Sequence, residues 1–324
     1  MRRIAHAGAS AVLAACFVSN AMAQDTYPNK PLRLIVPYAP GAITDLAARL
    51  LAEHLSAGLG QPIIVENKSG GGARIGALAV ANAPPDGYTL LFANSVTHGT
   101  VPAMSRSLPF DPVKSFAPVG RAFVYSSTLV CNHAIPPNTI GELIRYTTEH
   151  PDKLTNATAG PGTGHDLLGG LYNSVTGGRM LHVHYRGAAP ALQDVLGGTA
   201  DCIWGGGDVK QYVQNGKLKA FATSGERRDP DFPDVPTMAE AGVKNFKIVW
   251  WQGVAAPAGT PPAVVARLNQ AINQAVDAAA LKERARVLSL VPAGGSPEDL
   301  ARIIQEDLAR YSAIVKSANI PFQD

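Results

Sequence analysis

Short apolar segments, each followed by a loop and then a helical pattern, recur along this chain, and this order restricts the possible folds more than any other feature. The first unit has an apolar segment at Leu32–Val36, a loop at Pro37–Ile43 and a helical pattern with leucines on one face. A second unit at 62–81 contains the glycine-rich loop Ser69–Gly72. Strands that alternate with helices at this spacing form parallel sheets with helices on both faces. The sequence therefore predicts an α/β fold.

The second half of the chain repeats this order. A predicted strand at 154–158 leads through a glycine-rich loop into a helix that begins at His165. Two longer apolar runs, 122–131 and 248–256, are typical of segments that connect two lobes. A chain of 324 residues is long enough for two domains.

We therefore expect two lobes joined by a hinge of two crossing strands. Residues 24–121 and 257–324 are predicted to form lobe 1. Residues 122–256, which include both crossing strands, are predicted to form lobe 2.

The first 23 residues resemble a secretory signal peptide. They have a basic start, an apolar stretch over 4–18 and the small residues Ala21 and Ala23. The apolar stretch is shorter than the roughly 20 residues of a membrane helix. We expect a signal peptide at 1–23, cleaved after Ala23, and a periplasmic protein. Cys16 also fits the bacterial lipoprotein box, so a lipid anchor at Cys16 is an alternative, as is an uncleaved signal anchor.

The charge of the chain argues against a nucleic-acid partner. Its formal charge is +3, and Arg2 and Arg3 in the predicted signal peptide account for two of these charges, which leaves about +1. Nucleic-acid-binding proteins carry a far more basic surface. The 6% aromatic content also offers few stacking surfaces for single strands.

Two cysteines remain after cleavage, Cys131 and Cys202, in an oxidising compartment. They could form one disulfide, or both could be small buried hydrophobic residues, since the sequence does not give the distance between their Cα atoms. No C-x-x-C and no zinc-type spacing occurs. Redox chemistry and structural zinc are not expected.

Motifs for catalysis and nucleotide binding are absent from the sequence. It contains no G-x-S-x-G and no G-x-x-x-x-G-K-[ST], and the glycine runs at 70–76, 160–164 and 205–207 do not complete G-x-G-x-x-G. His182 and His184 alternate on a predicted strand and could bind a metal, but no third ligand accompanies them. We expect them to be hydrogen-bonded strand histidines, and we expect no catalytic residues, no cofactor and no metal.

Two loops instead favour anion binding. Pro37–Ile43 and Ala159–Gly164 each run from a strand into a helix, whose first turn has N–H groups without partners in the helix. Thr44 and Thr163 could cap these helices or donate hydroxyl hydrogen bonds. Ordinary tight turns are the alternative. Two such loops in two hinged lobes favour a carboxylate held between them.

Characteristic stretches run in order through the chain after residue 24. They include PYAPGAITDLAARLLAEHL, PDGYTLLFANSVTH, ATAGPGTGHDLLGGLY and HVHYRGAAPALQDVLGG. In these stretches the chain resembles the substrate-binding proteins of tripartite tricarboxylate transporters, the Bug or TctC family. The resemblance implies a type II, "Venus flytrap" periplasmic binding protein for a small carboxylate, which could be a dicarboxylate, a tricarboxylate, an amino acid or an aromatic acid.

The resemblance also implies partners. A binding protein of this kind delivers its ligand to membrane transporter subunits, and we expect it to be a monomer. A receptor that signals to a membrane sensor is an alternative. A periplasmic enzyme acting on a carboxylate is a less favoured one, since no positioned nucleophile and base are evident.

The resemblance places the ligand between loops of both lobes. The implied ligand-binding residues are Tyr38, Gly41, Ala42, Ile43 and Asp45 in the first loop, Asn94, Ser95, Thr97 and His98 after the third strand, and Gly162, Thr163, Gly164 and His165 in the opposing lobe. Ile43 stands where the family usually has glycine, so it could narrow the pocket. Asp45 could instead serve the helix dipole, and His98 and His165 could brace loops.

Arg74 and Asp208 depart from the family pattern and are added to the predicted site. Arg74 lies in a glycine-rich loop and could pair with a second ligand carboxylate, although a solvated surface arginine is the alternative. Asp208 could select an amine or cap the following helix.

Overall fold

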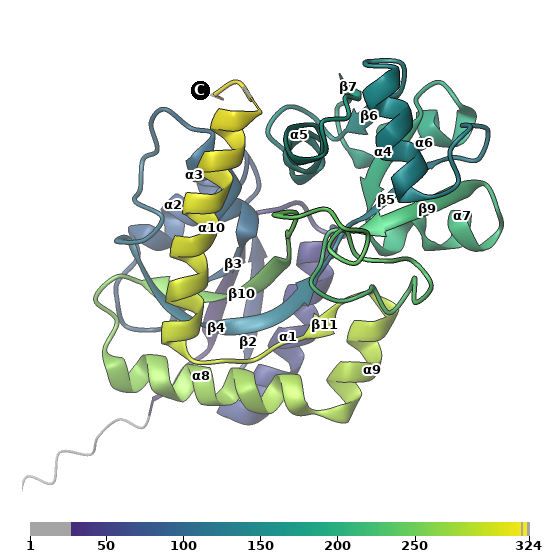
Figure 1. The fold of residues 1–324 in the computed structure, drawn as a ribbon. Helices are drawn as coiled ribbons and strands as arrows, with labels where there is room; N and C mark the ends of the chain where they lie inside the picture. Colours follow the sequence, from purple (N-terminus) through teal and green to yellow (C-terminus); the bar gives the residue numbers. More distant parts are fainter. Residues whose placement is uncertain (1–26, 319, 323–324) are drawn as a thin grey trace, which may run out of the picture.

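The computed structural model describes residues 27–318 and 320–322 and contains two β-sheets, each covered by helices (Figure 1). The two sheets with their helices form two lobes, which confirms the predicted two-lobed α/β fold. The predicted signal peptide and Cys16 lie outside the described residues. Within the described part of the chain, no helix combines the length and the apolar character that a membrane crossing requires.

The sheet of the first lobe has six strands in the order β11-β4-β10-β3-β1-β2. The strands are β1 (Leu32–Val36), β2 (Ile63–Asn67), β3 (Thr89–Asn94), β4 (Phe116–Tyr125), β10 (Trp250–Pro257) and β11 (Val291–Pro292). β1 pairs in parallel with β2 and β3, whereas β10 runs antiparallel to β3 and β4. The carboxyl ends of the three parallel strands therefore lie at one edge of the sheet.

Helices cover both faces of this sheet because successive strand residues point to opposite sides. Leu34 packs in one core cluster and Ile35 in another. The first cluster includes α1 (Ile43–Leu59), α8 (Pro262–Asp277) and α9 (Ala279–Val287). The second includes α2 (Arg74–Ala81) and the first half of α10 (Pro297–Ser317). The short helices η1 (Val96–Thr100) and α3 (Val101–Ala103) follow β3.

The sheet of the second lobe has five strands in the order β7-β6-β8-β5-β9. The strands are β5 (Thr128–Asn132), β6 (Thr155–Thr158), β7 (Leu181–His184), β8 (Cys202–Gly205) and β9 (Leu218–Thr223). The helices are α4 (Ile140–Glu149), α5 (Gly164–Thr176), α6 (Ala188–Gly197), η2 (Gly207–Val209) and α7 (Lys210–Gln214). β6 is parallel to β7 and β8, so α5 starts at the carboxyl end of a parallel strand, as α1 does in the first lobe.

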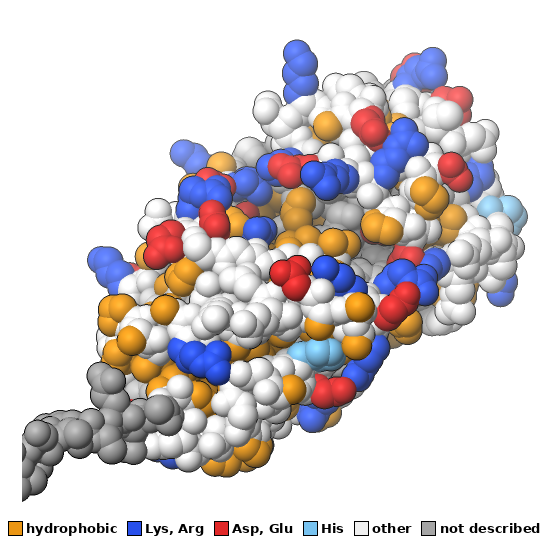
Figure 2. Space-filling view, turned by 90° about the horizontal axis from the view of Figure 1, so that it is seen from below, with side chains coloured by type: hydrophobic (Ala, Val, Ile, Leu, Met, Phe, Trp, Pro, Cys, Tyr) orange, Lys and Arg blue, Asp and Glu red, His pale blue; other side chains and the backbone are white. Residues whose placement is uncertain are grey.

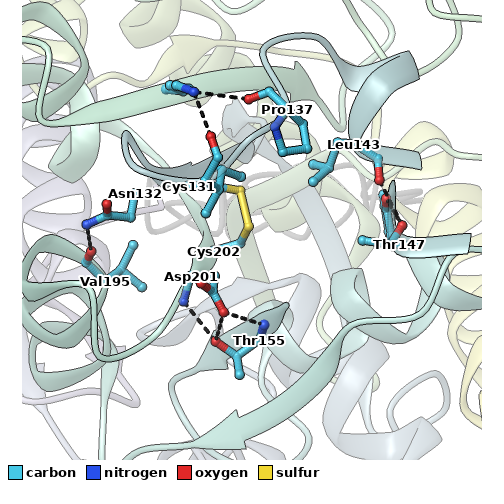
Figure 3. Close-up of a disulfide and its surroundings, with 12 residues drawn as sticks. Cys131, Asn132, Pro137, Leu143, Thr147, Thr155, Val195, Asp201 and Cys202 are labelled. Carbon is cyan, nitrogen blue, oxygen red and sulfur yellow. Dashed lines mark hydrogen bonds between the residues drawn. A yellow bond between two sulfur atoms is a disulfide. The ribbon is translucent and has the colours of Figure 1, made fainter. Parts of the chain in front are cut away.

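A disulfide joins β5 to β8 (Figure 3). Cys131 and Cys202 face each other in the antiparallel register, and both are fully buried. Beside the bridge, the Asp201 carboxylate accepts hydrogen bonds from the backbone N–H and the hydroxyl of Thr155, at 2.8 and 2.9 Å. Of the two alternatives, a disulfide or two separate buried thiols, the structure has the disulfide.

The chain crosses between the sheets within the two predicted runs, but neither run belongs to one sheet as a single crossing strand of the second lobe. The run 122–131 forms two strands, because β4 ends at Tyr125 in the first sheet and β5 begins at Thr128 in the second. Within the run 248–256, β10 begins at Trp250 and pairs with first-sheet strands. An apolar run does not reveal which sheet supplies its partners. The other limits of the predicted lobes stay a prediction.

Helix α10 contacts both lobes, although the prediction placed all of 257–324 in lobe 1. Its first half packs against the first sheet, and its second half places Tyr311 and Ile314 in a core cluster with residues of α5. Figure 1 shows α10 running from beside α8 to the level of α5. At Gly170 in α5, an added Cβ would lie 3.0 Å from the Cβ of Ala318. An amphipathic pattern does not specify which lobe covers it.

A candidate ligand-binding cleft

A continuous cleft lies between the lobes and consists of three adjoining cavities of about 550, 180 and 530 Å³. Val96 and Thr163 line both the first and the middle cavity. Tyr125, Ser127 and His165 line both the middle and the third. The three cavities therefore form one space for a ligand.

One face of the molecule is visibly hollowed (Figure 2). Hydrophobic side chains lie in the hollow, and charged side chains of both signs surround it. This face carries no extended patch of a single charge. An apolar hollow with a few polar groups is a common form of small-molecule site.

Both lobes present the same loop to the cleft, with the spacing P-G-x-x-x-D. In the first lobe Gly41 donates its backbone N–H to Asp45, and in the second Gly162 donates to Asp166, each at 2.9 Å. The two glycines have φ angles of 83° and 74°, in the left-handed region that glycine adopts without strain. Each loop therefore enters its helix in the same way.

These loops leave the helix N-termini open to the cleft. Neither α1 nor α5 has a side-chain cap at its first turn. The hydroxyl of Thr163, the N-cap residue of α5, instead donates to the carbonyl oxygen of Gly160 at 2.8 Å. The first N–H groups of a helix have no partners within the helix, and they carry the positive end of its dipole. The start of α5, at Gly164, thus lines the middle cavity, and the start of α1, at Ile43, lines the third.

The carboxylate of Asp45 braces its loop. It is only 2% exposed and also accepts hydrogen bonds from Arg49 Nε at 3.0 Å and Asn67 Nδ2 at 2.8 Å. Burial opposes ionisation, but these donors together lower the pKa of Asp45 below its usual value. Asp45 does not line the cleft, which agrees with the alternative of a local role at the helix start.

Asp166 is the corresponding residue of the second lobe, and the sequence analysis missed it. Its Oδ1 lies 2.6 Å from Nδ1 of His182, and Thr158 Oγ1 lies 2.8 Å from Nδ1 of His184. Burial opposes ionisation of Asp166, but His182 and the Gly162 N–H outweigh it and lower its pKa. The expectation of hydrogen-bonded strand histidines is confirmed. The spacing shared with Asp45 is the signal that could have identified Asp166.

The segment after β3 lies mostly in the interior. Asn94 Oδ1 accepts the N–H groups of Val96 and Thr97 at 3.0 and 2.9 Å, and Asn94 Nδ2 donates to the hydroxyl of Tyr38 at 3.0 Å. Tyr38 lines the cleft, and burial raises the pKa of its phenol, which keeps the hydroxyl protonated. Asn94 therefore holds Tyr38 in place from behind the cleft wall.

His98 lies deeper still. It is fully buried between Phe116 and Trp251, and its Nδ1 lies 2.8 Å from Thr97 Oγ1. Burial lowers the pKa of His98 to about 4. Ser95 accepts the backbone N–H of Trp251 at 2.8 Å. These contacts agree with the alternative in which His98 braces the loop.

His165 lines the middle and third cavities at the start of α5. Its Nδ1 is buried and has no hydrogen-bond partner within the described part of the chain. Burial lowers the pKa of His165, and the nearby charge of Asp208 opposes this shift. The neutral imidazole can offer a ligand one hydrogen bond.

The two ends of the cleft differ in charge. At one end, Arg74 lines the first cavity and its Nη2 donates to Ser105 Oγ at 2.5 Å. At the other end, Asp208 and Asp229 line the third cavity. A ligand in this cleft therefore lies in an asymmetric electrostatic field.

The structure brings about half of the predicted residues to the cleft. Those that line it are Tyr38, Ile43, Arg74, Gly162, Thr163, Gly164, His165 and Asp208. Those that do not are Gly41, Ala42, Asp45, Asn94, Ser95, Thr97 and His98. Lining residues that the sequence analysis missed include Tyr125, Ser126, Ser127, Asp229 and Trp250, which lie at or near the crossings and carry no motif.

The structure also bears on metal binding and on hydroxyl groups at the cleft wall. The described residues contain no group of three histidine, cysteine, aspartate or glutamate side chains arranged to bind a metal ion. The serine and histidine residues that line the cleft are Ser69, Ser105, Ser126, Ser127, Ser289 and His165. The Ser127 hydroxyl accepts the indole N–H of Trp250 at 2.9 Å, and this hydrogen bond holds both side chains in the cleft wall.

Residues 47–320 match the model of the tripartite tricarboxylate transporter family receptor, TctC. Among solved structures, the chain is similar to the periplasmic binding protein BugD, with 34% identity, a TM-score of 0.76 and coverage of 92% of this chain and 100% of that one. It is similar to Rpa4515 of R. palustris with adipate, at 30% identity, a TM-score of 0.79 and coverage of 91% and 99%. MatC from Rhodopseudomonas palustris with bound malate has 34% identity, a TM-score of 0.75 and coverage of 89% and 100%.

Proposed function

Because this chain belongs to the family of tripartite tricarboxylate transporter receptors, we propose that it captures a small carboxylate between its lobes and delivers it to a membrane transporter of the tripartite tricarboxylate type. The observation that carries this proposal is the pair of P-G-x-x-x-D loops, each of which leads into a helix whose first residue, Ile43 or Gly164, lines the cleft. Such N-termini attract anions. The similar proteins with adipate and malate support a carboxylate as the ligand class.

We also propose that the protein is exported and that it does not convert its ligand. The signal peptide is cleaved after Ala23, and the protein acts in the periplasm as a monomer. It releases its ligand unchanged, as a receptor and not as an enzyme. Intact mass of the exported protein tests the first part, since a chain that begins at Gln24 is expected and a lipidated Cys16 would contradict it.

The ligand itself is tested by native purification, denaturation and mass spectrometry of the released small molecule, together with calorimetric titration of adipate and malate. We expect a carboxylic acid in the released fraction and saturable binding of at least one of the two acids. A receptor that releases no acid, and that binds neither these two nor other carboxylates, would contradict the proposal.

Two glycine variants locate the site. Gly162 lies in the second P-G-x-x-x-D loop, and Gly177 ends α5 away from the cleft; their φ angles are 74° and 73°. Gly162→Ala and Gly177→Ala therefore introduce similar backbone strain, of about 1 kcal/mol. We expect both to lower stability and only Gly162→Ala to weaken carboxylate binding by about tenfold or more. Equal binding by the two variants would place the ligand elsewhere.

We propose that Arg74 forms an ion pair with a second carboxylate of the ligand. A guanidinium at one end of the cleft attracts a dicarboxylate more than a monocarboxylate of the same length. Titration of Arg74→Gln with adipate and with caproate, its monocarboxylate analogue, is expected to show a larger loss for adipate. Equal losses would remove Arg74 from direct recognition.

A further inference from the structure

The end of the cleft opposite Arg74 carries the negative charge of two carboxylates. Asp229 and Asp208 both line a cavity of about 530 Å³ next to the crossing between the lobes. Neither forms an ion pair with any residue that the structure describes. Partial burial makes an uncompensated charge costly at Asp229, whereas Asp208 is exposed to water.

Asp229 is the more enclosed of the two. One carboxylate oxygen accepts the backbone N–H of Asp231 at 2.9 Å, and the other lies 3.4 Å from the hydroxyl of Ser126. Asp208 is exposed, and its Oδ1 accepts the N–H of Gly206 at 2.8 Å. These neutral donors hold both carboxylates in place without cancelling their charge.

The charge of Lys210 also reaches Asp229, but Lys210 is held by another carboxylate. Lys210 forms an ion pair with Asp231, which also accepts the hydroxyl of Ser289. Lys210 therefore pairs with Asp231 and has only a smaller, longer-range effect on Asp229. Burial, followed by the charge of Asp231, outweighs the opposing donors and raises the pKa of Asp229, as expected for a carboxyl that lacks a close positive partner.

A ligand that spans the cleft thus meets the start of α5 at the middle cavity, and the carboxylates of Asp208 and Asp229 in the third cavity, which Ile43 also lines. Between Asp229 and the anion-attracting helix start lies His165, whose buried Nδ1 has no partner among the described residues. A second carboxylate placed at this end would be repelled by two like charges. A protonated nitrogen would be attracted, and it would relieve the desolvation cost of Asp229.

We infer that Asp229, assisted by Asp208, is a specificity-determining residue that selects ligands carrying a protonated nitrogen in addition to the carboxylate. This inference rests on the proposed function, because the carboxylate fixes the ligand at the centre of the cleft. It narrows the ligand class from carboxylates in general to zwitterions such as amino acids with a free amino group. The same charge excludes acids whose second anionic group points toward the crossing.

Matched pairs of probes test this inference by calorimetric titration. Adipate and ε-aminocaproate differ in whether the second end is a carboxylate or an ammonium group. Malate and aspartate differ in whether the second carbon bears a hydroxyl or an ammonium group. For the wild-type protein we expect the amino member of at least one pair to bind about tenfold more tightly than its partner, which corresponds to about 1.4 kcal/mol.

The variant Asp229→Asn keeps the shape and the hydrogen-bonding capacity of the side chain and removes the charge. We expect it to weaken the amino ligand about tenfold and to leave its partner unchanged or bound more tightly. Opposite changes for two ligands cannot come from partial unfolding, which weakens both. Asp234→Asn is the matched control, because it removes the same charge from an exposed residue of the same segment outside the cleft.

The outcomes separate this inference from the proposed function. If in both pairs the wild-type protein binds the acid as tightly as its amino analogue, or if Asp229→Asn changes both members of the preferred pair alike, the inference is wrong and the carboxylate receptor stands. If no carboxylate binds to the wild type and none is released from the purified protein, the proposed function falls and the inference falls with it.

Discussion

Removal of the Cys131–Cys202 disulfide should loosen the second lobe selectively. The two cysteines are 71 residues apart in the sequence, and the loop that they close carries α4, β6, α5, β7 and α6. In the chain-entropy description, a loop of this length stabilises the folded state by about 4 kcal/mol. The double variant Cys131→Ala/Cys202→Ala should lose about this amount. Alanine is preferred to serine because both positions are fully buried and a hydroxyl would lack a partner there.

Hydrogen exchange resolved along the chain measures this loss where it occurs. A loss of about 4 kcal/mol speeds exchange through open states about a thousandfold. We expect this acceleration in β6 and α5, and much smaller changes in β1 and β3, which belong to the other sheet. Wild-type protein treated with a reductant should reproduce the variant. Unchanged exchange in α5 would refute the argument from loop length, and equal acceleration in both sheets would show that the lobes unfold as one unit.

Three further predictions concern single residues. Asp166→Asn should weaken carboxylate binding by about 1 to 2 kcal/mol in a titration, because a neutral amide cannot accept from both Gly162 and His182 as the carboxylate does; unchanged affinity would show that the loop holds its position without this carboxylate. The folded-state pKa of His98, about 4, lies below its ordinary 6.5, so the unfolded chain binds the proton first. The free energy of unfolding should therefore be highest above pH 6.5 and fall by about 3 kcal/mol toward pH 4, and His98→Gln should give a flatter pH profile in denaturant titrations. Gly99→Ala should lower the melting temperature, because the new Cβ would lie 2.5 Å from the Tyr311 ring; an unchanged melting temperature would mean that the ring can move away without cost.

Much of the fold is predictable from the sequence because its signals are local. Apolar strands followed by loops and helices specify both sheets, and Ser296 and Asp299 form the capping box that starts α10 as a helix N-terminus signal suggests. The crossings were harder to place, because the break between β4 and β5 falls at Ser126 and Ser127 inside one mostly apolar run. No local pattern shows that strand partners change there.

The candidate site, too, has parts that the local sequence predicts and parts that it does not. The loops that face the cleft follow from their position between strand and helix, whereas the direction of individual side chains depends on partners far away in the sequence. Asp45 turns inward toward Asn67, and His98 turns inward against Trp251. Asp229 reaches the cleft from a segment without a motif. Such contacts are set by tertiary packing, which a single sequence does not display.

Helix α10 contacts both lobes, so it restricts how the lobes can move relative to each other when the cleft opens or closes. A helix of 21 residues is about 30 Å long and resists bending, so it cannot follow both lobes if they rotate apart. If the lobes rotate apart, one of them must move relative to α10, and the close contact of Gly170 with Ala318 and Ile320 lies on that boundary. Ala318 and Ile320, which follow α10, therefore lie where the second lobe meets the C-terminal segment. A tag or truncation at this end would therefore change how the two lobes move relative to each other, although it lies outside the cleft.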